Sequence, residues 1–239
     1  AVVRSVYTKT KHSSIILSVR ISLCLDKRIT GVIDFRHAGN RRIGGSITVI
    51  YIIRHGQTEQ NNQKLLAGRR DYPLNEKGVE QARAAGARLR EQNIHFDVVY
   101  SSPLSRAIRT AELVAPGAEI KVDEHLIEME FGPYEGMDLT HPLPEVSGFF
   151  SDFEHNPAPQ GMERLEDVVG RLGEFLELLK GDAAKKNILL STHAIAMKGA
   201  LTYLTPPERS HYWSQYIENC AVYMTELVDG SYTEPVPLR

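Results

Sequence analysis

Residues 47–57 read ITVIYIIRHGQ, and this stretch decides the fold. Every position from Ile47 to Ile53 is β-branched or aromatic, which predicts a buried strand of a parallel sheet. In open α/β sheets, ligands bind beyond the carboxyl ends of the strands, so Arg54, His55 and Gly56 are expected at a ligand site. An arginine beside a histidine is suited to holding an anionic group against a nitrogen nucleophile.

The rest of the chain alternates between strand and helix patterns. Apolar residues at helical spacing predict helices over 75–91 with Asn75 as N-cap, 102–114 with Ser102 as N-cap, 165–180 and 194–204. Apolar, mostly β-branched runs predict strands over 97–100, 119–122, 187–191 and within 216–228. This order predicts the α/β class, as a three-layer α/β/α fold with a mostly parallel central sheet.

The composition excludes several classes of protein. With 42% apolar and 24% charged residues among 239, the chain has ample material for a core. No apolar run approaches the roughly 18 residues of a membrane span, so we expect no membrane partner. Cys24 and Cys220 lie far apart without a CxxC motif, which favours a reducing, cytoplasmic compartment. The zinc-type spacings of His and Cys are missing, and we expect neither a metal nor a cofactor.

Charge divides the chain into two parts. Residues 1–46 carry nine Lys or Arg and two Asp or Glu, a net charge of +7, whereas residues 47–239 carry 19 basic and 28 acidic residues, a net charge of −9. A nucleic-acid surface needs basic residues spread along one face, so no nucleic-acid partner is expected for 47–239. We expect 47–239 to be the working domain and 1–46 to be a basic extension that is not integral to it.

Three interpretations of this extension stay open. Alternating apolar residues from Ile15 to Leu25 fit an added strand or hairpin. The positive charge fits an arm that docks on an acidic partner or on the domain itself. The segment could also be foreign to the working protein. Because no methionine precedes Met129, we expect a processed, truncated or non-standard start.

Three segments place polar residues directly after predicted strands. They are Arg54-His55, Ser101 to Arg106, and Thr192-His193. If the three strands are neighbours in one sheet, two histidines and two arginines converge beyond its edge. Any one of these residues alone fits packing or a solvated helix face, but the set together predicts a site for an anion.

Five blocks along the chain resemble the histidine phosphatase superfamily, also called the phosphoglycerate mutase-like family. The order and spacing of the blocks agree with that family, and the resemblance covers residues 48–228. The blocks are IYIIRHGQ (50–57), GRRDYPLNEKG (68–78), SSPLSRAIRTA (101–111), LIEMEFGPYEG (126–136) and LLSTH (189–193).

This resemblance implies a role for each residue of the site. His55 would be the nucleophile that forms a phosphohistidine, and Glu128 would be the general acid. Glu128 is preferred to Glu130 because it stands four residues before Gly132, as the motif requires. The phosphoryl oxygens would be held by Arg54, Arg106 and His193, and the substrate-binding loops would include Gln57, Thr58, Asn61, Gly68, Arg69 and Ala194.

Physical chemistry supports these roles independently. Phosphoryl transfer needs a nucleophile, in-line positioning and charge stabilisation, which two guanidiniums supply without a metal. The same guanidiniums are expected to lower the pKa of His55 and keep it neutral. Backbone amides at the start of the helix after His193 are expected to add donors to the bound anion. A bound phosphate dianion would raise the pKa of a nearby carboxyl such as Glu128, which suits a general acid.

Residues 139–161 are rich in proline, glycine and aromatic residues, which predicts an irregular flap. This flap bears on the identity of the substrate. It contains no Lys or Arg, but it contains Phe149, Phe150 and Phe153. A flap without cations is poorly suited to a doubly anionic phosphoglycerate, which favours a phosphatase over a mutase and suggests an apolar or ring-bearing leaving group. Simple packing of the three phenylalanines is an equal alternative, and Arg69 and Arg70 could supply a second anion site.

We therefore expect a metal-independent phosphomonoesterase that acts on a small phosphorylated metabolite. Sugar phosphates, nucleotides, α-ribazole phosphate and phosphoserine are candidates, because the fold does not choose among them. Two alternatives stay open: a cofactor-dependent phosphoglycerate mutase, and a module that binds phosphorylated ligands without turnover. The expected partner is the small-molecule phosphomonoester, with a homodimer as an open option.

Overall fold

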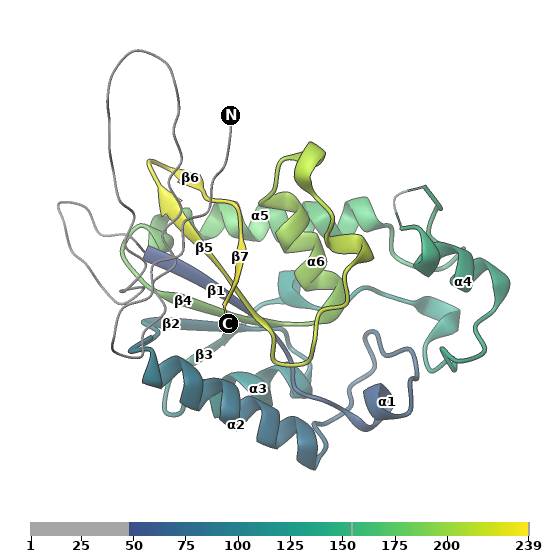
Figure 1. Cartoon of the computed structure of the whole chain (residues 1–239), viewed down its shortest axis with the longest axis horizontal. Coiled ribbons are helices and arrows are strands. Elements are labelled where there is room, and N and C mark those ends of the chain that lie inside the picture. Colours follow the sequence, from purple (N-terminus) through teal and green to yellow (C-terminus); the bar gives the residue numbers. More distant parts are fainter. Residues whose placement is uncertain (1–47, 154, 239) are drawn as a thin grey trace, which may run out of the picture. The chain divides into compact units, whose positions relative to one another are not determined.

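A single sheet organises the part of the chain that the computed structural model describes, residues 48–153 and 155–238. The expectations for residues 1–46 lie outside these described residues. The strand order is β3-β2-β4-β1-β5-β6, and β7 pairs with β5 (Figure 1). The strands are β1 (Thr48–Arg54), β2 (Val98–Ser101), β3 (Ile120–Val122), β4 (Ile188–Thr192), β5 (Val222–Val228), β6 (Ser231–Tyr232) and β7 (Val236–Leu238).

The first four strands are parallel to one another. β4 lies between β1 and β2 and pairs with both in parallel, and β2 pairs in parallel with β3. β5 runs antiparallel to β1 on its other side. The prediction of a mostly parallel α/β sheet is therefore confirmed. The topology brings the carboxyl ends of β1, β2 and β4 to the same edge.

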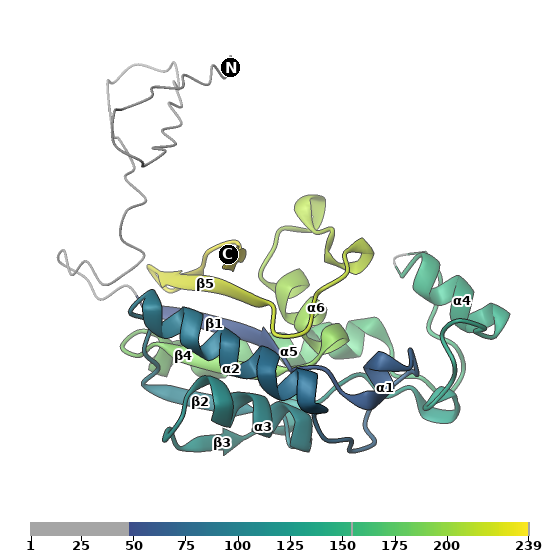
Figure 2. The ribbon, with the colours of Figure 1, turned by 60° about the horizontal axis from the view of Figure 1, so that its bottom comes forward.

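Helices cover both faces of the sheet, as Figure 2 shows. On one face α2 (Glu76–Glu91) and α3 (Ser105–Val114) pack on Tyr51 and Ile53. On the other face α5 (Leu165–Ala183) and α6 (Ala194–Tyr203) pack on Ile50 and Ile52. Successive side chains of β1 point to opposite faces, so a continuous apolar run serves both layers.

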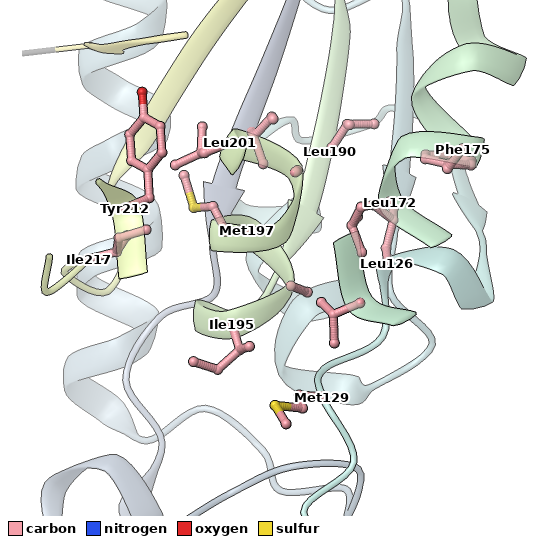
Figure 3. Close-up of a cluster of buried hydrophobic side chains, with 14 of the residues drawn as sticks. Leu126, Met129, Leu172, Phe175, Leu190, Ile195, Met197, Leu201, Tyr212 and Ile217 are labelled. Atoms are coloured by element: carbon pink, nitrogen blue, oxygen red, sulfur yellow. The ribbon is translucent and has the colours of Figure 1, made fainter. Parts of the chain in front are cut away.

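The larger core cluster lies between the sheet, α5 and α6. Figure 3 shows Met197 and Leu201 of α6, Leu172 and Phe175 of α5, and Leu190 of β4 together in this cluster. Leu126 and Met129 also belong to it, so the segment that carries Glu128 is anchored in the core on both sides of that residue.

Short helices complete the fold. They are α1 (Glu59–Asn62), α4 (Pro144–Ser151) and the 3-10 helices η1 (Glu124–Leu126), η2 (Gly132–Tyr134), η3 (Pro207–Arg209) and η4 (Tyr212–Ser214). No helix of the described residues is long and apolar enough to cross a membrane.

Two local expectations differ from the structure. Asn75 does cap α2, since its side chain accepts from the Gly78 N–H at 2.8 Å. Ser102, in contrast, does not cap α3. This helix begins at Ser105, and its N-cap residue is Leu104, whose side chain provides no capping hydrogen bond. The flap 139–161, expected to be irregular, contains α4. Pro144 at the first helical position, followed by an acidic residue, is the start signal that the aromatic and glycine content obscured.

Two helical glycines give a matched test of the packing of α2 on α3. A β-carbon at Gly86 would lie 2.9 Å from the Val114 Cα, whereas one at the exposed Gly170 of α5 meets no heavy atom within 4 Å. We expect Gly86→Ala to lower the free energy of unfolding by about 1–3 kcal/mol through overpacking. Gly170→Ala should raise it by roughly 0.5–1 kcal/mol, because alanine favours the helix. Urea denaturation measures both, and equal stabilisation by the two substitutions would contradict the close contact of α2 and α3.

Candidate active site

The register of β1 and β4 places His55 beside His193. Arg54 is the partner of Thr192 in this parallel pair, and the next residue on each strand is a histidine. The His55 N–H donates to the Thr192 carbonyl at 2.9 Å. The two imidazole rings lie 5.1 Å apart at 60° to each other, and both are buried. The convergence expected from the sequence is thus observed for the two histidines.

Glycine is required directly after His55. Gly56 packs against Gly78 in the first turn of α2, and a β-carbon at either position would overlap the backbone of the facing segment. The Gly56 N–H donates to Thr110 Oγ1 at 3.0 Å, and Thr110 Oγ1 in turn donates to the Arg106 carbonyl at 2.7 Å. This close approach fixes the loop after β1 against α2 and α3.

The orientation of the His55 ring is set by its own backbone neighbour. Nδ1 lies 2.7 Å from the Gly56 carbonyl oxygen, which can only accept, so the neutral ring carries its proton on Nδ1 and its lone pair on Nε2. Burial holds the pKa of His55 well below its usual value of 6.5, and the positive charges of Arg106 and Arg54 lower it further. His55 is therefore a neutral imidazole with a free nucleophilic nitrogen at Nε2.

Arg106 is the most buried cation of the site, with 1% of its surface exposed. Its Nη2 donates to the Gly68 carbonyl at 2.6 Å and its Nη1 to the Arg70 carbonyl at 2.9 Å. Its Nε donates to His193 Nδ1 at 3.2 Å. A guanidinium has five N–H groups, so two donors of Arg106 remain for a further acceptor.

Arg54 and His55 both line a cavity of the protein. The Nη1 of Arg54 donates to the Ile217 carbonyl, and its guanidinium lies 5.7 Å from the centroid of the Tyr216 ring. Its Nε is buried and has no hydrogen-bond partner among the described residues. A buried donor without a partner is costly, so Arg54 Nε is a ready donor for an anion in the cavity.

Both ring nitrogens of His193 are engaged. Because Nδ1 accepts from Arg106, the proton of the neutral ring lies on Nε2, and that N–H donates to Ser102 Oγ at 2.7 Å. Burial holds the pKa of His193 well below its usual value, and its electrostatic interactions with Arg106 and His55 lower it further. Ser102 was expected only as a helix cap, and its role as a partner of His193 was missed because that contact joins residues 91 positions apart.

The side chain of Glu128 is buried and lies against the N-terminus of α6. Its carboxylate accepts from the N–H groups of Met129 at 2.8 Å, Ala196 at 2.9 Å and Ile195 at 3.2 Å. The amides after His193 were expected to donate to a bound anion. In the structure those of Ile195 and Ala196 donate to Glu128 instead, because a carboxylate is itself the anion that a helix N-terminus favours.

Of the loop residues expected to bind substrate, Asn61 and Ala194 line the cavity. Gln57 and Thr58 do not line it. The Gln57 side chain accepts from Asn75 Nδ2 at 3.0 Å, and Thr58 forms a reciprocal capping box with Asn61 at the start of α1. This capping box fixes Asn61 in place.

Arg69 and Gly68 also lie outside the cavity lining. The Arg69 guanidinium forms ion pairs with Glu130 at 3.0 Å and with Glu163 at 3.1 Å. The charge of Arg69 is thus already balanced by two carboxylates. This pairing does not fit the suggestion that Arg69 supplies a second anion site. Gly68 accepts from Arg106 through its carbonyl and donates to Glu135 at 2.8 Å through its N–H.

Asn219 is a further site residue that the sequence patterns did not indicate. Its Nδ2 donates to the His55 carbonyl at 2.9 Å and contacts Asn61 Oδ1 at 3.4 Å. It stands just before Cys220, which adopts a positive φ of 58° at the entry to β5. The hydrogen bond to His55 spans 164 positions of sequence, so no local pattern carries it.

The cavity over these residues has a volume of about 490 Å³, within the range of small-molecule sites. Arg54, His55, Asn61 and Glu128 line it. Arg106 and His193 are not among the lining residues. The remaining lining is Leu65, Leu66, Ala67, Phe131, Leu139, Pro142, Ser147, Phe150, Ser151, Ala194 and Ile195.

Residues 50–234 match the histidine phosphatase superfamily, branch 1. The chain belongs to this superfamily. A putative phosphoserine phosphatase 2 of Hydrogenobacter thermophilus is 30% identical over 178 residues, which are 72% of this chain and 86% of that protein. A broad-specificity phosphatase of Saccharomyces cerevisiae is 34% identical over 167 residues, 66% of this chain and 71% of that protein.

A solved structure shows the same fold. The crystal structure of phosphoglycerate mutase from Bacillus anthracis matches with a TM-score of 0.69 at 27% identity, and the match covers 80% of this chain and 92% of that one. The family resemblance and the fold expected from the five sequence blocks are thereby confirmed.

The two buried histidines predict a dependence of stability on pH. Their pKa values are lowered in the folded protein, so below about pH 6.5 the unfolded chain binds protons that the folded chain does not. Stability should therefore fall as the pH drops from 6.5 toward the folded pKa values, by up to about 1.4 kcal/mol per pH unit for each histidine. Urea unfolding of His193→Gln between pH 7.5 and 5 should show a shallower slope. His95→Gln, at an exposed position, is the control, and an equal change in both variants would contradict the prediction.

Proposed function

We propose that this protein is a phosphomonoesterase that transfers the phosphoryl group of a small phosphorylated metabolite to His55 and then to water. One observation carries the proposal. A neutral, buried imidazole presents Nε2 beside Arg54, whose Nε is an unmatched buried donor, and both residues line the cavity. Such a nitrogen is a nucleophile, and such a donor is suited to a phosphoryl oxygen.

The reaction has two steps. In the first, His55 Nε2 attacks phosphorus, the bond from phosphorus to the ester oxygen breaks, and Glu128 gives its proton to the departing alkoxide. In the second, Glu128 takes a proton from water, the water oxygen attacks the phosphohistidine, and the bond from nitrogen to phosphorus breaks to release phosphate. Arg54, which lines the cavity, stabilises the charge on the transferred group. The buried charge of Arg106 adds to the positive potential around His55, and His193 positions Arg106 by accepting from its Nε.

No metal enters this proposal, because the two guanidiniums supply the positive charge that a metal ion supplies in other phosphoryl transfers. Arg54 and Arg106 approach His55 from different elements, β1 and α3.

A cytoplasmic location is proposed from the cysteine content. The lack of a nucleic-acid partner and the option of a homodimer stay predictions.

Hydrolysis is favoured over a mutase reaction by the flap. The side chains that it contributes to the cavity are Leu139, Pro142, Ser147, Phe150 and Ser151, none of which carries a charge. A second phosphate or a carboxylate on the substrate would thus lack a cation there. The likeness to a phosphoglycerate mutase keeps the mutase reaction as the alternative.

The proposal is tested by phosphate release from a panel of phosphomonoesters in the presence of EDTA. Wild type should turn over at least one ester with EDTA present, and His55→Ala should lose at least about a thousandfold in kcat because the nucleophile is gone. An acid-labile phosphoenzyme should be trapped with wild type alone. Isomerisation of 3-phosphoglycerate without phosphate release would mean a mutase, and stoichiometric binding of esters without turnover would mean a binding module.

The assignment of the general acid is tested by substitutions at two glutamates that stand two positions apart, Glu128 and Glu130. Glu128→Gln should slow single-turnover phosphorylation of His55 by an alkyl phosphate about a hundredfold or more, because the alkoxide then leaves without a proton. The same variant should be much less impaired with p-nitrophenyl phosphate, whose phenolate needs no proton. Glu130→Gln, at an exposed residue paired with Arg69, is the matched control. A larger loss in Glu130→Gln would move the acid by two residues.

A further inference from the structure

Most of the cavity lining differs in its chemistry from the residues proposed to act on the phosphoryl group. Among the described residues, the charged or titratable side chains that line the cavity are Arg54, His55 and Glu128, all of which are assigned to phosphoryl transfer. The apolar part of the lining is Leu65, Leu66, Ala67, Phe131, Leu139, Pro142, Phe150, Ala194 and Ile195. A charged leaving group placed against this apolar lining would lose its hydration and gain no ionic partner, which is costly.

Backbone pairing builds this apolar wall. The segment before the flap pairs with the loop that carries Leu65 and Leu66, since Leu66 N–H donates to the Met137 carbonyl at 2.8 Å and Gly136 N–H to the Leu66 carbonyl at 2.7 Å. Leu139 N–H continues the pairing by donating to the Lys64 carbonyl at 2.9 Å. These backbone hydrogen bonds therefore hold the two sides of the wall together.

Aromatic packing fixes the position of α4. The Phe149 and Phe153 rings lie 4.9 Å apart, and the Phe153 ring lies 5.7 Å from that of Trp213. The buried Lys198 donates to the Trp213 carbonyl at 2.9 Å and lies 5.2 Å from the centroid of the Phe153 ring. Phe149 and Phe153 are thus packing residues. Phe150 belongs to the same aromatic cluster, with its ring 5.5 Å from that of Phe149 and 5.3 Å from that of Phe153.

Phe150 differs from Phe149 and Phe153 because it also lines the cavity. It lines the cavity with Ser147 and Ser151, three residues before and one after it, so one face of α4 is turned toward the site. This face offers an aromatic ring with hydroxyl groups on either side. Such a surface suits a leaving group that is largely apolar or ring-bearing and carries hydroxyl or similar uncharged polar groups.

We propose that the substrates of this enzyme are monoesters of uncharged, apolar or ring-bearing alcohols, and that Phe150 determines this specificity. The proposal rests on the proposed phosphatase function and goes beyond it by excluding charged leaving groups. It therefore separates this chain from its relative that is named as a putative phosphoserine phosphatase, because phosphoserine carries an ammonium and a carboxylate on its leaving group.

The experiment compares esters of alcohols with similar leaving ability, so that chemistry does not mask binding. The kcat/KM for 2-phenylethyl phosphate is measured against those for O-phosphoserine and 3-phosphoglycerate in wild type, Phe150→Ala and Phe150→Arg. Wild type should prefer 2-phenylethyl phosphate at least about tenfold, and Phe150→Ala should remove most of that preference. Phe150→Arg should raise the relative kcat/KM for the two carboxylate-bearing esters.

Phe153→Ala is the control, since it removes an aromatic ring from the same flap at a position outside the cavity lining. It should leave the preference of wild type unchanged, even if it lowers the melting temperature. Faster hydrolysis of O-phosphoserine than of 2-phenylethyl phosphate by wild type overturns this inference alone, as does an equal fall for all three esters in Phe150→Ala. The absence of phosphate release from every ester would overturn the proposed function as well.

Discussion

The buried guanidinium of Arg106 is the interaction on which the site depends. It lies between α3, the loop at Gly68 and His193, and it uses three of its five donors to join them. A buried cation without acceptors would destabilise the fold, so the chain supplies two carbonyl oxygens and an imidazole nitrogen. The same charge disfavours protonation of both histidines, which links the packing of the loop to the reactivity of His55.

The sequence predicted the residues that follow strands better than it predicted their partners. Arg54, His55 and His193 were recognised because a strand end is a local feature, and the parallel pairing of β1 with β4 then brings the histidines together. Ser102 and Asn219 were missed as site residues because their contacts with the histidines join residues 91 and 164 positions apart. Arg69 was assigned to a substrate-binding loop from the family resemblance, whereas in the structure its guanidinium pairs with Glu130 and Glu163, which come from distant segments.

The flap shows why composition alone was an incomplete guide. Three phenylalanines within five residues allowed either packing or substrate contact, and the structure divides them between the two. The three rings pack on one another, but Phe149 is buried in the core cluster, whereas Phe150 is partly buried and also lines the cavity. The helix itself was overlooked because aromatic and glycine residues weaken the helical signal, although Pro144 marks its beginning.

The strand order has a consequence for how the chain is made. β1 is the first strand along the described residues, yet both of its neighbours, β4 and β5, come from the last quarter or so of the chain. While a ribosome synthesises the protein, the apolar segment Ile50–Ile53 therefore has no strand partner from the described part of the chain until residues 188–192 have emerged. An unpaired apolar strand is prone to association with other chains. Chaperone binding to the growing chain should consequently persist until β4 enters between β1 and β2.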